Sequence, residues 1–76
     1  MKTNNYYPKI VEWSEEDQCY VGTCPSLMYG GCHGDNEKEV FNELCNLVDE
    51  TITIYKNENM ELPKLLSIEE IYGKAA

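Results

Sequence analysis

The sequence predicts an α+β fold in which a three-stranded antiparallel sheet carries one long helix packed on one face. Short stretches rich in aromatic and β-branched residues come first, separated by polar, glycine- or proline-containing turns. One long segment with the apolar period of a helix follows, from about residue 36 to residue 59. Strands joined by short loops pair antiparallel, which leaves the helix to cover one face of the sheet.

The long helix is expected to begin at Asn36, because Asn36 and Glu39 have the spacing of a capping box. Apolar residues then recur at helical spacing, at Val40, Leu44, Leu47, Val48, Ile52 and Tyr55, with Phe41 and Cys45 widening the stripe. No glycine or proline interrupts the segment before Pro63, so we expect one continuous helix.

The strands before the helix are short. The first is predicted over Tyr6–Trp13, a polar loop over Ser14–Gln18, and the return strand over Cys19–Cys24. Gly22 is expected to face the helix, because a position without a side chain lets another element approach closely. A third short strand around residues 30–33 leads into the helix.

One helix covers only one face of a sheet, so the other face needs its own explanation. We expect the row Tyr7, Val11 and Trp13 of the first strand to lie on this second face, where its apolar side chains would meet water. An oligomer or a protein partner is then the physical expectation. The alternative is that the tail from Leu65 to Tyr72 folds back over that face.

Length predicts a single domain over residues 1–76, with a core at about residues 6–63 and a tail at 64–76. The tail contains a short helix opened by a second capping box, Ser67 and Glu70. A domain this small buries only about 60% of its unfolded surface, so a partner or a further copy would add stability. With no apolar signal core and no run of the ~20 apolar residues that span a membrane, we expect a cytoplasmic protein.

The charge is strongly acidic, with 14 acidic residues against 6 lysines and a net charge of −8. The chain has no arginine, the usual bidentate ligand of phosphate and guanine, so we do not expect direct binding of nucleic acid. An acidic surface instead attracts a basic protein by electrostatic steering. The plain alternative is a soluble acidic protein with no such partner.

The four cysteines do not have the spacing of a metal site or a disulfide framework. Cys19 and Cys24 lie five residues apart on one predicted strand, so their side chains should point to opposite faces. There is no Cys-x-x-Cys pair, and the single histidine, His33, follows Cys32 directly. We therefore expect reduced, partly buried thiols, no metal and no other cofactor.

The acidic residues also do not form an evident catalytic set. A two-metal nuclease needs several carboxylates that converge on Mg²⁺, and the candidates are Glu12, Asp35 and Glu39. Glu39 is better explained as a helix cap and Glu12 as an alternating strand position. A lone histidine in a turn is more often solvated than catalytic. We do not expect an enzyme.

Several motifs occur in a characteristic order. They are Tyr7-Pro-x-Ile-Val-x-Trp, an acidic hairpin loop, Cys-Tyr-Val-Gly, Pro25-x-Leu27, and Gly34-Asp-Asn-x-x-Glu39 before an apolar helix. This pattern resembles the HicB antitoxins over roughly residues 6 to 63, including the interval from Pro25 to Gly34. Met28-Tyr29-Gly30 stands where that family usually has Pro-Gly-Cys, and Val40 replaces a common alanine.

The resemblance implies a partial ribonuclease-H-like fold, β-β-β-α with a short C-terminal segment, that has no catalytic role. It also implies a partner, a small basic HicA-type toxin that cleaves mRNA and whose catalytic histidine and RNA surface the antitoxin blocks. Most members continue into a helix-turn-helix or ribbon-helix-helix domain that binds DNA. Residues 63–76 are too short for either, so operator binding is not expected of this sequence.

The leading hypothesis is therefore a toxin–antitoxin protein whose role is protein–protein interaction. The expected contacts with the toxin are Trp13, Glu15, Glu16, Asp17, Leu27, Met28 and Tyr29. The alternative is a stand-alone homo-oligomeric domain, a dimer or larger, with a structural or regulatory role and no toxin. A neighbouring open reading frame for a short, basic, histidine-containing protein would favour the first.

Overall fold

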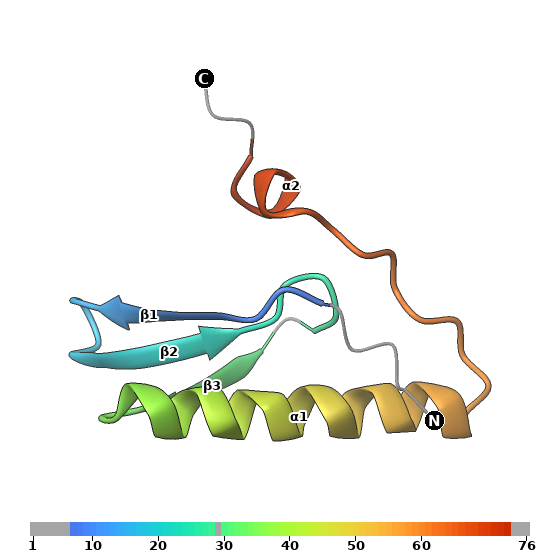
Figure 1. The fold of residues 1–76 in the computed structure, drawn as a ribbon, viewed down its shortest axis with the longest axis horizontal. Coiled ribbons are helices and arrows are strands. Elements are labelled where there is room, and N and C mark those ends of the chain that lie inside the picture. The colour runs from blue at the N-terminus through green and yellow to red at the C-terminus, as the bar shows by residue number, and fades with distance from the viewer. Residues whose placement is uncertain (1–6, 29, 74–76) are drawn as a thin grey trace.

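The computed structural model describes residues 7–28 and 30–73. Strands β1 (Ile10–Ser14), β2 (Cys19–Thr23) and β3 (Gly31–Gly34) form one antiparallel sheet in the order β1-β2-β3. Helix α1 (Glu37–Asn57) lies along one face of this sheet, and the short helix α2 (Ile68–Tyr72) stands apart from it (Figure 1). The predicted α+β class, with three antiparallel strands and one long helix packed on them, is confirmed. No helix of the described ranges is long and apolar enough to cross a membrane.

The bounds of the elements differ from the prediction by a few residues. β1 begins at Ile10 rather than Tyr6, which lies outside the described residues, and β3 lies one residue later than predicted. α1 ends at Asn57 because Asn59 adopts a left-handed conformation, with φ 57°. The Asn59 amide then donates to the Lys56 carbonyl and the Met60 amide to the Tyr55 carbonyl, at 3.2 and 2.8 Å. These two bonds are those of a Schellman motif.

Both predicted helix starts are present. The Asn36 side-chain oxygen accepts a hydrogen bond from the Glu39 amide at 3.0 Å, which is one of the two bonds of a capping box. In α2 the box is complete, because Ser67 accepts from the Glu70 amide while the Glu70 carboxylate accepts from the Ser67 amide. The side-chain oxygens satisfy backbone donors that have no partner within the helix.

The core lies between α1 and the sheet, and it includes Cys32 of β3. Val40, Leu44, Val48 and Ile52 repeat every four residues along α1 and are almost completely buried. Gly22 faces them as predicted, since a Cβ built there would lie 3.0 Å from Val40 Cγ1 and 3.4 Å from Leu44 Cδ2. The absence of a side chain at this position is what allows α1 to lie this close to the sheet.

The expected placement of the row Tyr7, Val11 and Trp13 is wrong. Val11 pairs with Gly22, and directly paired residues point to the same face, which at Gly22 is the helix face. Tyr7 is buried and Val11 packs against the core. The face turned away from α1 carries instead a mixed set: Ile10, Glu12, Ser14, Cys19, Val21, Thr23, Gly31 and His33. The alternation of side chains between the two faces of β1 was predicted correctly. Which of the two sets faces α1 is decided by the register of the β1–β2 hairpin.

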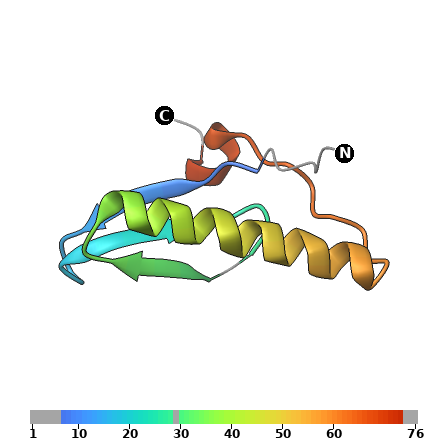
Figure 2. The ribbon, with the colours of Figure 1, turned by 60° about the horizontal axis from the view of Figure 1, so that its bottom comes forward.

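α1 is much longer than the strands it covers. Its 21 residues span about 31 Å, whereas the five residues of β1 span about 17 Å. The second half of α1 therefore extends past the sheet in both views (Figure 2). The connection after β2 covers this part, with Leu27 only 5% exposed and Met28 packed against the core. The Thr51 hydroxyl also lies 3.7 Å from Met28 Sδ.

The tail does not cover the open face of the sheet, so that alternative is also wrong. Leu62 packs against the core beside α1, and the Tyr7 hydroxyl donates a hydrogen bond to the Pro63 carbonyl. The Leu66 amide donates to the buried Ser26 hydroxyl at 3.2 Å. Among the described helices and strands, α2 contacts no other element. The tail thus closes the end of the core and leaves the sheet face open.

The four cysteines are free thiols, as expected, and two of them make stability depend on pH. Burial raises the pKa of the Cys24 and Cys32 thiols above 9.0, and burial raises the pKa of Tyr7 above 10.0. At a pH below its ordinary pKa, each group is neutral in both the folded and the unfolded protein. The folded state therefore has its full stability in that pH range. As the pH rises, the unfolded chain loses these protons first, and stability falls.

We therefore expect the urea midpoint to be lower at about pH 10 than at about pH 8. Cys24→Ala removes one of the titrating groups, so its midpoint should fall less over the same interval even though it is less stable throughout. Urea unfolding of the two proteins at both pH values measures this. Equal losses in the two proteins would contradict a role for the Cys24 thiol.

Candidate functional site

The antiparallel register collects acidic side chains at one end of the molecule. Ser14 pairs with Cys19, and Tyr20 pairs with Gly34, so the β1–β2 hairpin and the β3–α1 turn lie at the same end. Figure 1 shows the hairpin and the start of α1 together at that end. Six exposed carboxylates belong to the hairpin, to the β3–α1 turn and to the first turn of α1: Glu15, Glu16, Asp17, Asp35, Glu37 and Glu39. We call this set the acidic end.

The carboxylates of the acidic end differ in what they do for the fold. Glu37 and Glu39 stabilise the first turn of α1, where the helix dipole favours negative charge. Asp17 holds the hairpin, since its carboxylate accepts from the Ser14 hydroxyl at 3.2 Å. Glu15 accepts from the Trp13 indole at 3.2 Å. Glu16 makes no such bond within the described residues, and its charge faces water.

An apolar groove runs along the flank of the molecule between β1 and α1. Its walls are Val11, Glu37, Lys38, Phe41 and Asn42, and its volume is about 490 Å³. We call it the flank groove. Phe41 is 43% exposed, although it was expected to widen the buried stripe, because it follows Val40 and is turned away from the row that faces Gly22.

Two further aromatic rings lie near the flank groove, on the same face of the sheet as Val11 and closer to the acidic end. Trp13 follows Val11 by two residues on the same face of β1 and is 47% exposed. It pairs with Tyr20, and their rings meet edge to face with centroids 5.1 Å apart. This geometry is favourable for aromatic pairs and holds the indole in place.

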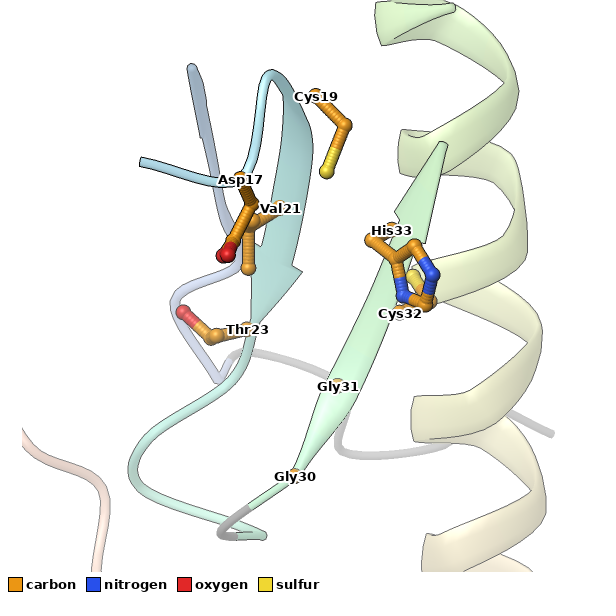
Figure 3. A pocket seen from close by; sticks show the side chains of 8 residues that line it. All are labelled: Asp17, Cys19, Val21, Thr23, Gly30, Gly31, Cys32 and His33. Atoms are coloured by element: carbon orange, nitrogen blue, oxygen red, sulfur yellow. The ribbon is translucent and has the colours of Figure 1, made fainter. Parts of the chain in front are cut away.

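A second hollow, of about 590 Å³, lies on the open side of the sheet (Figure 3). It is lined by Asp17, Cys19, Val21, Thr23, Gly30, Gly31, Cys32 and His33. Val21 and His33 are directly paired, which places Cys19 diagonally across from His33 on the same face. In the sequence, the cysteine considered beside His33 was its direct neighbour Cys32. In the structure the Cys32 thiol points to the core and donates to the Val40 carbonyl at 3.4 Å.

The hollow does not assemble a recognisable catalytic set. No hydrogen bond joins Cys19 to His33 in the described part of the chain, as an activated nucleophile would need. Across residues 7–28 and 30–73, no three His, Cys, Asp or Glu side chains are placed to hold one metal ion. The carboxylates considered for a nuclease are also spread over the molecule, with Glu12 on the open sheet face and Glu39 on α1.

The structure separates the predicted contact residues into two groups. Trp13, Glu15, Glu16 and Asp17 are exposed and lie together at one end. Leu27 is buried in the core that covers the second half of α1, so its side chain is not available to a partner, whereas Met28 packs against the same core and is partly buried. Tyr29 lies outside the described residues. Phe41 and Tyr20 were not predicted as contact residues. The i, i+4 spacing of Val40 and Leu44 already places Phe41 next to the buried row and not in it.

Comparisons of the chain with protein-family models, with curated proteins and with solved structures found no match.

Proposed function

We propose that this protein is a HicB-like antitoxin module that binds and neutralises a small, basic, mRNA-cleaving toxin of the HicA type. In this proposal the β-β-β-α unit is a partial ribonuclease-H-like fold that acts by covering the toxin. It blocks the catalytic histidine and the RNA-binding surface of the toxin, and it performs no chemistry itself. The cytoplasm, where mRNA is translated, is the compartment in which such a module acts.

The observation that carries the proposal is the acidic end. Glu16 makes no hydrogen bond within the described residues and Glu15 bonds only to groups of the hairpin itself, and both carboxylates add to the negative field around the start of α1. A protein that binds RNA must expose basic groups, and an acidic partner competes for the same groups. Clustered charge of one sign also speeds the encounter with a partner of the opposite sign.

The motif order supports the same proposal. The segments that resemble HicB sequences form β1, the hairpin, β2, the connection after β2, and the turn before α1. Pro25 and Leu27 belong to a connection that the core holds in place, since Leu27 is buried. The residues of the resemblance therefore lie in one continuous structural unit.

Co-expression tests the proposal directly. The chain is produced together with any short, basic, histidine-containing protein whose open reading frame is found next to its own, and mRNA cleavage is measured in cells that carry one protein or both. We expect cleavage with the basic protein alone, none with both, and a stable complex that weakens steeply as salt is added.

A matched pair of triple variants tests the acidic end. Glu15→Gln with Glu16→Gln and Asp17→Asn removes three charges there, and we expect association about tenfold slower. Glu50→Gln with Glu58→Gln and Glu61→Gln removes three exposed charges elsewhere and should have a smaller effect. If the chain neither binds nor inhibits the basic protein and forms a homo-oligomer instead, the antitoxin proposal is wrong and the stand-alone structural or regulatory domain replaces it.

A further inference from the structure

We infer that the flank groove is a docking site for an arginine side chain of a basic protein partner. The inference deepens the proposed function, because it takes the basic partner from there and names the surface and the chemistry of contact. The flank groove and the aromatic rings beside it are distinct from both the open sheet face and the end of the core closed by the tail.

The apolar part of the site is built from rings that the fold leaves half exposed. Phe41 lies on the α1 side of the groove and Val11 on the β1 side, and Trp13 follows two residues after Val11 on the same face of β1, nearer to the hairpin. Trp13 is held by its edge-to-face contact with Tyr20 and by its indole hydrogen bond to Glu15. Exposed aromatic side chains that are fixed by neighbours bind a partner at little cost in conformational entropy.

The polar rim of the site favours a cation. Glu15 lies against the Trp13 indole and Glu37 lines the groove, whereas Lys38 is the one basic group in its lining. A cation over an aromatic face gains from the ring quadrupole, and more so where a carboxylate is close. The rings and the carboxylates together therefore fit a positively charged side chain better than an apolar one.

The charge of the chain argues against a second copy as the occupant. Two copies would each bring a net charge of −8, and each would place its own acidic end near the contact. Like charges brought together at an interface oppose association. Arginine is favoured over lysine because its planar guanidinium stacks on rings, forms bidentate bonds with a carboxylate and is more weakly hydrated than an ammonium group. The chain has no arginine of its own to fill the groove.

Trp13 is the only tryptophan of the chain, so its emission reports on the site without a label. The probe is a tetra-arginine peptide blocked at both ends, titrated into the full chain at low salt. We expect a saturable change in Trp13 emission with this peptide, a weaker one with tetralysine, and none with the peptide in which citrulline replaces arginine. Citrulline keeps the shape of the side chain and loses its charge.

Variants on the same helix separate the groove from general charge attraction. Phe41→Gln removes a ring of the groove, and we expect the dissociation constant of the tetra-arginine peptide to rise about three- to fivefold. Ile54→Gln is the matched control, because Ile54 is an exposed apolar residue of α1 that lies outside the groove. Lys38→Gln should tighten binding by about twofold or more, since it removes the positive charge from the rim.

A second pair of variants tests the rim. Glu15→Gln keeps an acceptor for the Trp13 indole and removes the charge, so binding should weaken about two- to fivefold. Glu50→Gln makes the same change in net charge on the outer side of α1 and should have less effect. Circular dichroism and the thermal midpoint of each variant show that the fold is kept.

Three results would overturn the inference. Equal binding of the arginine and citrulline peptides would exclude a cation site. Equal effects of Phe41→Gln and Ile54→Gln would place the peptide elsewhere on the acidic surface. A concentration-dependent dimer in sedimentation that Phe41→Gln disrupts would make the groove an interface between copies.

The basic protein used in the co-expression test separates this inference from the proposed function. Suppose that the basic protein binds and is inhibited, but that its binding leaves Trp13 emission unchanged and the Phe41→Gln variant binds it as tightly as the original chain. The docking site in the flank groove is then wrong, and the antitoxin role stands. If the tetra-arginine peptide docks as expected and the basic protein is not bound, the antitoxin role is wrong and the groove stands.

Discussion

Replacing Gly31 by alanine is expected to destabilise the protein by about 3 kcal/mol or more. A Cβ built on Gly31 would lie 1.9 Å from the Gly22 carbonyl oxygen and 3.0 Å from the Gly22 carbonyl carbon. Both are backbone atoms of the neighbouring strand, so neither can turn away as a side chain would. β3 would have to separate from β2 at the end where Gly31 pairs with Thr23. A domain of this size has only about 4–11 kcal/mol of total stability, so the loss should be large in urea unfolding.

The neighbouring glycine is the control for this prediction. A Cβ built on Gly30 meets nothing within 4 Å. Gly30→Ala should therefore change the free energy of unfolding by no more than about 0.5 kcal/mol, or stabilise slightly by restricting the unfolded chain. Similar stabilities for Gly30→Ala and Gly31→Ala would mean that β3 does not pair with β2 in this register.

The elements and their order were predictable because they depend on local chemistry. The i, i+4 apolar row of α1 and the Asn36 cap follow from residues near one another in the chain, and the close approach at Gly22 follows from the missing side chain of that one residue. The last turn of α1 was left open by the sequence, because no glycine or proline interrupts the segment before Pro63 and the helix ends through the left-handed conformation of Asn59.

The direction of the β1 side chains was not predictable in the same way. Alternation places Val11 and Trp13 on one face, but only the pairing of Ser14 with Cys19 decides that this face meets α1. A shift of one residue in the hairpin would reverse the assignment.

The apolar connection at Leu27 and Met28 was ambiguous for a related reason. Its burial depends on α1 extending past the sheet, which requires comparing the lengths of a helix and a strand in three dimensions.

The candidate site was predicted in part. The hairpin carboxylates and Trp13 were identified from sequence, because an acidic loop after an aromatic residue is visible in the printed chain. The flank groove was not, since Phe41 and Val11 are 30 positions apart in the sequence numbering and meet only through packing. Phe41 was predicted to belong to the buried stripe of α1, so its exposed position was not expected.

Leu44→Ala is expected to cost about 2–5 kcal/mol, the range for removing a large buried side chain. Leu44 is 0% exposed and lies over Gly22, which has no side chain that could move into the space left behind. Ile54→Ala removes a side chain of similar size from the same helix where it is 57% exposed, and should change stability by no more than about 0.5 kcal/mol. Thermal and urea unfolding of both variants measures the difference.

The contact between Leu44 and Gly22 can be tested by combining substitutions. Gly22→Ala alone should destabilise by about 1–2 kcal/mol, because its methyl group would crowd Val40 Cγ1 at 3.0 Å and Cys32 Sγ at 3.3 Å, next to Leu44 Cδ2 at 3.4 Å. In the Leu44→Ala background the same methyl group enters part of the cavity, so the double variant should lose less stability than the sum of the two single losses. Strictly additive losses would show that α1 does not pack on β2 through this pair, and the placement of the helix on the sheet would have to be revised.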